Sequence, residues 1–301
     1  MNIDNIHRIL IVGAGTMGQQ IGLQCAMYGY QVTLYDLAPE MLAAATEQIK
    51  VYADHLVATD RLSQDEAEVA LARITTTTDP AQAAQADLLS ESVPEDPILK
   101  GQVLAQFNRL CPPHTIFTTN TSMLLPSMFA EDTGRPAHFA ALHFHQIVWE
   151  SNVVDIMPHP GTAAETVELL QQFAQRIGQI PIVLQKEHYG YVFNSMLGAL
   201  NRAAISLAAK EVASIEDIDR AWMGVMKTRI GPMGILDVIG LKTAWDITAY
   251  WAKTLHDPEL QTNADFLKQY VDRGWLGVKT GRGFYSYPEP AYQQPGFLEG
   301  K

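Results

Sequence analysis

The sequence predicts an α/β fold: an N-terminal, Rossmann-type doubly wound sheet with an inserted helical hairpin, followed by an all-α domain. Apolar strand-like runs alternate with helical segments over the first 185 residues, and such an alternation builds a mostly parallel sheet. From residue 186 the strand-like runs stop and long helical patterns take over. We therefore expect a sheet domain at 1–185 and an all-helical domain at 186–301, within the usual domain size.

The first strand is predicted at Arg8–Val12, an unbroken apolar run typical of a strand buried on both faces. The run leads into a G-x-G-x-x-G motif and then a helix from Thr16 to Tyr28. The first glycine allows a tight turn, the second lets the backbone approach a pyrophosphate, and the third lets the helix pack closely. The helix N-terminus supplies N–H donors for phosphates. The predicted cofactor residues of this turn are Gly13, Gly15, Thr16, Met17 and Gly18.

The second predicted strand, Gln31–Tyr35, ends in Asp36, which lies near the position expected for an acid that binds ribose. A carboxylate there can accept both hydroxyls of the adenosine ribose and would repel a 2′-phosphate. The following Leu37-Ala38 offers no arginine to hold such a phosphate. The sequence therefore predicts NAD rather than NADP as the cofactor.

Residues 39–73 are predicted to form two helices that break near Thr59-Asp60. Ser63 and Glu66 have the spacing of a capping box at the start of the second helix. A helical hairpin is unusual at this place in a dinucleotide fold. A substrate-binding arm and a plain surface elaboration explain it about equally well.

Five further strand-like runs are predicted, with helices between them at 97–110 and 163–177. The runs are 87–91, 115–119, 139–143, 152–157 and 181–184. Ligands of such sheets bind beyond the carboxyl ends of the strands. Polar residues stand at those ends, namely Glu91, Asn120, His143 and Asp155, and we therefore expect the site there.

Helical patterns in the second domain cover residues 192–209, 215–226, 241–255 and 263–272. The first of these is apolar nearly all round, and such a helix is buried centrally or lies in a subunit interface. We therefore expect a homodimer built on this domain, since symmetric dimers are the commonest oligomers.

The composition is that of an ordinary globular protein, with 47% hydrophobic and 18% charged residues. A net charge of −12 argues against nucleic acid or an anionic membrane surface as partner. No signal peptide and no apolar run of membrane-spanning length is recognisable. Cys25 and Cys111 have neither metal-ligand spacing nor a disulfide framework. We therefore expect no metal and a cytoplasmic location.

Four polar residues interrupt the apolar pattern where chemistry would need them: Ser122, His143, Asp155 and Asn194. Taken singly, each is explained at least as well by a structural role, as a cap, a core histidine or an exposed acid on an edge strand. Together they supply a base, a carboxylate that orients it, and two donors for a substrate oxygen. This set predicts hydride transfer between the nicotinamide and a small alcohol or ketone.

The chain resembles the short-chain L-3-hydroxyacyl-CoA dehydrogenases, including 3-hydroxybutyryl-CoA dehydrogenases, over nearly its whole length. The motifs that carry the resemblance are Gly13–Gly18, Glu91–Asp96, Asn120–Ser122, Leu142–Phe144, Gly190–Asn194, Gly231–Gly234 and Lys279–Tyr285. The resemblance implies that His143 is the general acid/base, that Asp155 is its partner, and that Ser122 and Asn194 contact the substrate. It also implies a short acyl-CoA substrate, a place in fatty acid metabolism and dimers through the helical domain. The further NAD contacts that it implies are Glu95, Lys100, Asn120, Ser122, Gln146 and Lys279.

The sequence departs from this family at four places. One is the family's T-P-G-F, which reads His188-Tyr189-Gly190-Tyr191 here. The family usually reads H-F-F-N-P, whereas here the run is His143-Phe144-His145-Gln146-Ile147, so Gln146 replaces an asparagine that contacts NAD. Asp155 replaces the usual glutamate and is one methylene shorter. The hairpin, which carries several lysines near the CoA phosphates in members that use CoA, has few cations here: Lys50, Arg61 and Arg73.

The run from His143 to Trp149 is more similar to the diketoreductase-like branch of the family, which reduces β-keto esters or related 3-oxo compounds without CoA. The main prediction is thus an NAD-dependent 3-hydroxyacyl-CoA dehydrogenase. The first alternative is a CoA-independent reductase of 3-oxo or diketo esters, or of 3-hydroxy sugar acids. The second is a structural protein that keeps NAD, against which the set of Ser122, His143 and Asn194 argues.

Overall fold

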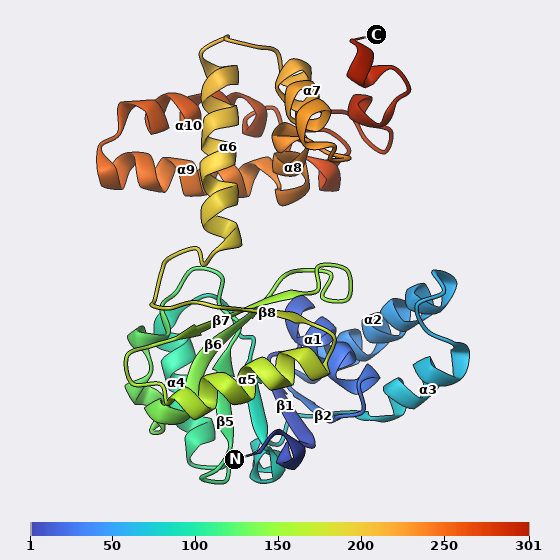
Figure 1. The fold of residues 1–301 in the computed structure, drawn as a ribbon, viewed down its shortest axis with the longest axis vertical. Coiled ribbons are helices and arrows are strands. Elements are labelled where there is room, and N and C mark those ends of the chain that lie inside the picture. Colours follow the sequence, from blue (N-terminus) through green and yellow to red (C-terminus); the bar gives the residue numbers. More distant parts are fainter. Residues whose placement is uncertain (1, 301) are drawn as a thin grey trace. The chain divides into compact units, whose positions relative to one another are not determined.

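The computed structural model describes residues 2–300, which form two compact units divided between Val192 and Phe193 (Figure 1). The boundary expected at residue 185 follows the last strand of the sheet, whereas the first compact unit continues through Val192. The second unit has its own apolar core, which includes Ile205, Met223 and Leu267.

An eight-stranded sheet forms the centre of the first unit, in the order β3-β2-β1-β4-β5-β6-β7-β8. Strands β1 to β6 pair in parallel, β6 and β7 pair antiparallel, and β7 and β8 pair in parallel. The strand order reverses between β1 and β4, which is where ligands bind to such sheets. The strands are β1 (Arg8–Val12), β2 (Gln31–Tyr35), β3 (Ile74–Thr77), β4 (Leu88–Glu91), β5 (Ile116–Thr119), β6 (Phe139–Phe144), β7 (Val153–Pro158) and β8 (Ile180–Val183).

Helices cover both faces of this sheet, because alternate side chains of a strand point to opposite faces. In β1, Ile9 and Ile11 join an apolar cluster with residues of α1 and α5, whereas Leu10 and Val12 join a cluster with residues of α4. The predicted doubly wound α/β fold is therefore confirmed. The helices of this unit are α1 (Thr16–Met27), α2 (Pro39–Ala58), α3 (Gln64–Ala72), α4 (Pro97–Asn108) and α5 (Ala164–Arg176).

The second unit is helical, as the sequence predicts, and two buried aspartates join its parts. Asp219 of α7 accepts hydrogen bonds from the backbone N–H groups of Met233 and Gly234 at the start of α8. Asp237 of α8 accepts hydrogen bonds from the N–H groups of Phe284 and Tyr285. The helices of this unit are α6 (Phe193–Ala209), α7 (Ile215–Met226), α8 (Pro232–Ile239), α9 (Leu241–Leu255) and α10 (Pro258–Val271).

The structure adds or moves a few elements relative to the sequence prediction. Strand β3 and helix α8 are not predicted, because β3 is a short edge strand with exposed threonines and α8 is a short, almost entirely apolar run without a polar face. Helix α10 begins at Pro258 rather than at 263, because Asp257 caps it by accepting from the N–H groups of Glu259 and Leu260. Among the described residues, no helix combines the length and the apolar character needed to cross a bilayer.

Candidate active site

The predicted nucleotide turn joins β1 to α1 in the way that its glycines require. Gly13 has a φ of +108°, and a Cβ there would lie 2.7 Å from the carbonyl oxygen of Ser92. A Cβ on Gly18 would overlap the carbonyl oxygen of Gly13, so the helix and the turn leave no room for a side chain. At Gly15, a Cβ would meet no described atom within 4 Å, and α1 begins there without a side-chain cap. The first N–H groups of α1 are therefore available to a phosphate.

Asp36 lies directly after β2 and beside this turn. Its Oδ2 accepts a hydrogen bond from Ala14 N at 2.9 Å, and its Oδ1 accepts one from Ala38 N at 3.1 Å. These bonds fix the carboxylate, which stays partly exposed. The remaining lone pairs can accept hydrogen bonds from ribose hydroxyls, the role that the sequence predicts for this residue.

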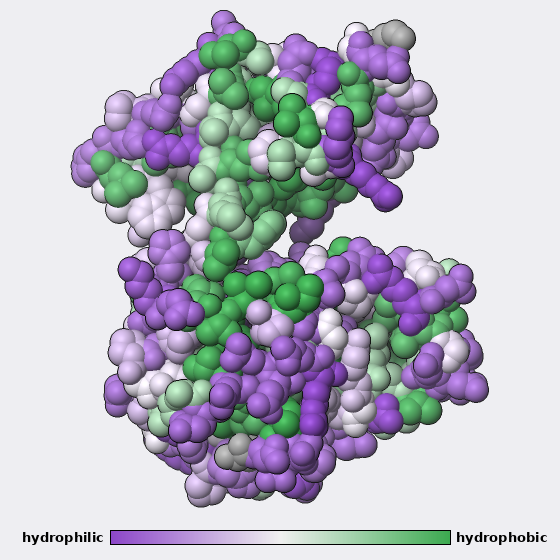
Figure 2. All heavy atoms as spheres, viewed as in Figure 1, coloured by the Kyte–Doolittle hydropathy of each residue, from purple (hydrophilic) through white to green (hydrophobic). Residues whose placement is uncertain are grey.

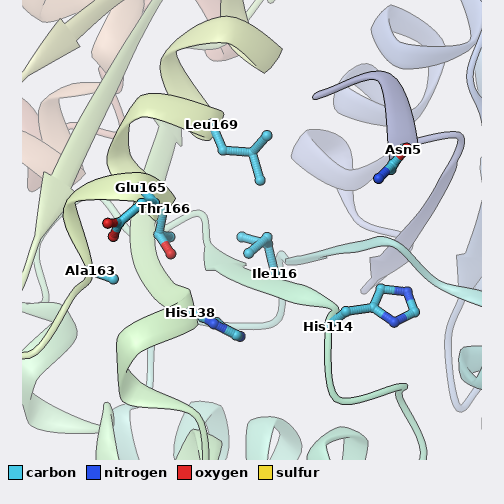
Figure 3. A pocket seen from close by; sticks show the side chains of 8 residues that line it. All are labelled: Asn5, His114, Ile116, His138, Ala163, Glu165, Thr166 and Leu169. Carbon is cyan, nitrogen blue, oxygen red and sulfur yellow. The ribbon is translucent and has the colours of Figure 1, made fainter. Parts of the chain in front are cut away.

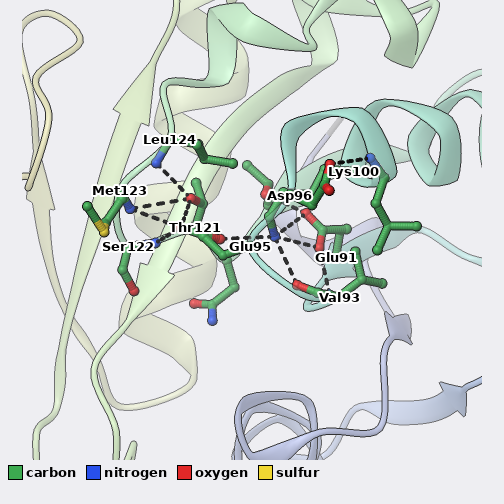
Figure 4. Close-up of polar contacts among 12 residues, drawn as sticks. Glu91, Val93, Glu95, Asp96, Lys100, Thr121, Ser122, Met123 and Leu124 are labelled. Carbon is green, nitrogen blue, oxygen red and sulfur yellow. Dashed lines mark hydrogen bonds and ion pairs between the residues drawn. The ribbon is translucent and has the colours of Figure 1, made fainter. Parts of the chain in front are cut away.

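Glu95, in the loop between β4 and α4, organises the loop that carries Ser122 (Figure 4). Its Oε1 accepts hydrogen bonds from Thr121 Oγ1 at 2.5 Å and from the N–H groups of Ser122 and Met123, both at 3.0 Å. Thr121 Oγ1 in turn accepts a hydrogen bond from Leu124 N. One carboxylate therefore sets the position of Ser122 at the end of β5.

Lys100 lies behind this loop, and its side chain is fully buried (Figure 4). Its Nζ lies 2.8 Å from Glu91 Oε1 and 3.4 Å from Glu95 Oε2, and it donates to the carbonyl oxygen of Val93 at 3.1 Å. Glu91 is also fully buried, and burial raises the pKa of its carboxyl although Lys100 and Thr119 donate to it. The structure thus places Lys100 against Glu91 and Glu95, so that it does not face solvent as a direct cofactor contact would.

Ser122, His143 and Asp155 form one hydrogen-bonded chain. His143 Nε2 lies 3.2 Å from Ser122 Oγ, and His143 Nδ1 lies 3.2 Å from Asp155 Oδ2. Only 4% of His143 and 1% of Asp155 is exposed, so Asp155 is not an exposed acid on an edge strand. The sequence pattern predicts Asp155 at the carboxyl end of a parallel strand, and this prediction is wrong, because Asp155 lies within β7. It reaches His143 because β7 runs antiparallel to β6 and places the two residues opposite each other.

The charge state of Asp155 assigns the tautomer of His143. Burial acts to raise the pKa of Asp155, but hydrogen bonds from His143 and His145 outweigh it, so that this pKa is lowered. An ionised carboxylate only accepts hydrogen bonds, and His143 therefore carries its hydrogen on Nδ1. The lone pair of Nε2 then faces the hydroxyl of Ser122, where an imidazole can take up a proton.

Two aromatic side chains without a predicted role surround His143. His145 Nε2 lies 3.2 Å from the same Asp155 Oδ2, and its ring centre is 4.8 Å from that of His143. The buried ring of Tyr191 packs against His143 with the centroids 4.7 Å apart. The H-x-H spacing could have pointed to His145, because alternate residues of an extended chain lie on one side.

Asn120 and Gln146 lie near the carboxyl ends of β5 and β6. Asn120 Oδ1 accepts a hydrogen bond from Phe144 N at 2.9 Å, which ties these two ends together. Gln146 is exposed in the loop that follows. Gln20 of α1 has no signal in the sequence, and its Oε1 holds this loop by accepting from Ile147 N at 2.7 Å.

The remaining two predicted site residues, Asn194 and Lys279, belong to the second unit. Asn194 is the second residue of α6 and is partly exposed. Lys279 is exposed in the short 3-10 segment Val278–Thr280. Their roles in the site stay predictions.

A surface hollow of about 610 Å³ lies beyond the amino ends of β5 and β6 (Figure 3). Its lining includes Ile116 at the start of β5, His138 just before β6, and Glu165 and Leu169 of α5. Ile116 and His138 lie at the amino ends of β5 and β6, whereas Asn120 and His143 lie near the carboxyl ends of the same strands. The hollow contains none of the predicted site residues and is not the cofactor site that they define.

Family models match most of the chain. Residues 8–188 match the model described as 3-hydroxyacyl-CoA dehydrogenase, NAD binding domain. Residues 190–287 match the model described as 3-hydroxyacyl-CoA dehydrogenase, C-terminal domain.

Similar proteins cover nearly the whole chain. A Bacillus subtilis protein named "Probable 3-hydroxybutyryl-CoA dehydrogenase" is 31% identical over 284 residues, which are 94% of this chain and 98% of that protein. The mitochondrial hydroxyacyl-coenzyme A dehydrogenase of Homo sapiens is 31% identical over 94% of this chain and 91% of its own length. A solved diketoreductase structure, concerned with dual catalysis of dicarbonyl compounds, has a TM-score of 0.86 at 38% identity and covers 94% of this chain and 99% of that one.

Proposed function

Since the chain belongs to the 3-hydroxyacyl-CoA dehydrogenase family, we propose that it interconverts a 3-hydroxyacyl and a 3-oxoacyl compound through the Ser122–His143–Asp155 chain. The predicted family, the NAD cofactor and the oxidoreductase class are confirmed by these matches. The observation that carries the proposal is His143 Nε2, which lies 3.2 Å from a hydroxyl while Nδ1 is held by a buried carboxylate.

Each member of the chain has one task in this proposal. In oxidation, His143 Nε2 accepts the proton of the substrate hydroxyl, and in reduction it returns a proton to the forming alkoxide. Asp155 holds the Nδ1–H tautomer and balances the charge of the imidazolium. Ser122, whose loop Glu95 fixes, donates to the substrate oxygen, and Asn194 of α6 supplies a second donor. When bound, the cofactor would supply the redox chemistry: NAD⁺ would take the hydride of the alcohol, and NADH would give a hydride to the ketone.

The residues of the first unit fit this cofactor. The turn from Gly13 to Gly18 leaves the start of α1 open to a pyrophosphate, and Asp36 beside it keeps lone pairs that could accept from ribose hydroxyls. We assign the nicotinamide half to Glu95, Asn120 and Gln146, together with Lys279 of the second unit. Lys100 acts through Glu95, because its own side chain is buried.

The substrate is a CoA thioester or a simpler 3-oxo compound, and the charges of the α2–α3 hairpin favour the simpler compound. All three cations of the hairpin are engaged within the protein. Lys50 pairs with Glu47, Arg61 donates to the carbonyl oxygen of Trp149, and Arg73 donates to that of Ala26. The acids of the same segment are Glu40, Glu47, Asp54, Asp60, Asp65, Glu66 and Glu68. This arm would repel the phosphates of CoA.

The experiment compares kcat/KM for NADH oxidation by acetoacetyl-CoA, by acetoacetyl-pantetheine and by ethyl acetoacetate. The first two share the acyl thioester and differ in the nucleotide, so their ratio isolates the CoA phosphates. Equal values for these two support a CoA-independent enzyme, and a preference of more than tenfold for acetoacetyl-CoA supports a CoA enzyme. Failure of all three substrates to oxidise NADH would contradict the proposed reaction.

We also propose that the second unit forms the dimer. Apolar side chains gather along α6 (Figure 2), where Phe193, Met196 and Leu207 are exposed. Exposed apolar residues on one helix are typical of a subunit interface. Light scattering should give twice the 33.3 kDa of the chain, and a monomer at micromolar concentration would contradict the proposal. A cytoplasmic location is in keeping with two free, buried cysteines.

A further inference from the structure

His145 makes a contact that the proposed reaction does not use. Its Nε2 lies 3.2 Å from Asp155 Oδ2, the oxygen that also lies 3.2 Å from His143 Nδ1. Two imidazoles therefore share one oxygen of a carboxylate that is 1% exposed. The side chain of His145 is 15% exposed, so this contact is partly buried.

We infer that His145 is a positioning residue, which holds Asp155 in the orientation that fixes the Nδ1–H tautomer of His143. This inference rests on the proposed role of His143, and His145 itself does not contact the substrate in it. Because an ionised carboxylate only accepts, His145 donates from Nε2 to the shared oxygen.

The distances indicate why a second donor is needed. Both hydrogen bonds to Oδ2 measure 3.2 Å, at the long end of the range for N–H···O bonds. Two such bonds to one oxygen restrain rotation of the carboxylate about its Cβ–Cγ bond more than either bond would alone. The ring of Tyr191 packs on His143, so the imidazole is not free to follow a carboxylate that turns away.

The test compares His145→Gln with His145→Phe. Glutamine keeps a neutral N–H donor at about the reach of Nε2, whereas phenylalanine keeps the ring and loses the donor. The matched control is His159→Gln, which removes another buried histidine, one that contacts the carbonyl oxygen of Pro136 outside the site. All samples contain EDTA, because one ligand atom each from His143, His145 and Asp155 lies within 4.8 Å of the others and could retain a trace cation.

The first readout is the tautomer of His143, measured by ¹⁵N NMR on protein without substrate. We expect the Nδ1–H tautomer in the parent protein, in His145→Gln and in His159→Gln, and a mixture of tautomers in His145→Phe. This readout needs no turnover, so it decides the inference even if every 3-oxo substrate fails. An unchanged tautomer in His145→Phe would overturn the inference.

The second readout separates kcat from KM. His145→Phe should lower kcat about 10- to 100-fold with little change in KM, a typical cost of losing a residue that orients an active group. His145→Gln should stay within about threefold of the parent, since it restores the donor. Equal losses in the two variants would mean that the ring merely fills space, and would overturn the inference.

A double variant tests the coupling directly. In His145→Phe combined with Asp155→Glu, the carboxylate reaches one methylene farther and can approach His143 without a second donor. We expect the kcat of the double variant to be at least tenfold higher than that of His145→Phe. Such a rise would be a strong departure from additivity. Additive losses would count against the inference. Should His145→Phe not fold, His145→Ala replaces it, with added imidazole as the rescuing donor and no rescue as the contrary result.

Discussion

Replacement of Lys100 by methionine tests the buried ion pair behind the active-site loop. The Lys100 and Glu91 side chains are both fully buried, with Nζ 2.8 and 3.1 Å from the two carboxylate oxygens. Methionine keeps an unbranched side chain but leaves Glu91 without its cation. Removing one partner of a buried pair costs about 3–5 kcal/mol, because the other charge stays buried and uncompensated. We therefore expect the free energy of unfolding to fall by about 3–5 kcal/mol.

Urea unfolding followed by circular dichroism measures this loss, with two further variants for comparison. In Glu91→Gln/Lys100→Met both charges of the pair are removed, and at least half of the lost stability should return. In Lys50→Met the same substitution breaks an exposed pair of similar length, Lys50 with Glu47 at 2.7 Å, and stability should hardly change. A loss below about 1 kcal/mol in Lys100→Met, or no recovery in the double variant, would refute this reasoning.

Three further predictions concern the cofactor turn and the helical unit. Asp36→Ala should raise the KM for NAD about 10- to 100-fold at nearly constant kcat, since the ribose loses its acceptor, and steady-state kinetics with an unchanged KM would contradict this. Gly18→Ala should abolish NADH binding in a fluorescence titration because its Cβ overlaps Gly13, whereas Gly224→Ala, a helical glycine whose Cβ meets no described atom within 4 Å, should bind normally. Burial raises the pKa of the Asp237 carboxyl, so the folded protein binds the proton of this group more tightly than the unfolded chain does. The stability that protonated Asp237 contributes is therefore present at low pH, and it is lost as the pH rises through the raised pKa. The difference in unfolding free energy between the parent and Asp237→Asn should therefore shrink as pH rises from about 4, and a growing difference would refute it.

The parts of the fold that the sequence predicts well are those with local signals. The turn from Gly13 to Gly18 needs residues without a Cβ, and the capping box of Ser63 and Glu66 lies within four residues. The direction of β7 has no such signal, because it depends on a long-range pairing with β6. Strand β3 likewise exists only through its pairing with β2, with Thr75 and Thr76 exposed.

In the candidate site, too, some residues have a local signal in the sequence and others do not. Ser122, His143 and Asp155 stand out as polar residues in apolar runs, and the structure brings them into one chain. The contact of His145 with Asp155 and the contact of Gln20 with Ile147 depend on how separate elements pack together. The order of residues does not reveal that packing. Likewise, a lysine normally indicates surface, so the burial of Lys100 could not be predicted from the sequence.

The most direct test of the central claim is hydride transfer in His143→Gln. The variant is mixed with NADH and the best 3-oxo substrate, and NADH oxidation is followed in a single turnover, with NADH affinity measured separately. If His143 moves the proton, the rate falls at least about 100-fold while the NADH dissociation constant stays within about threefold of the parent value. A variant that binds NADH and transfers hydride at the parent rate would contradict the role of His143.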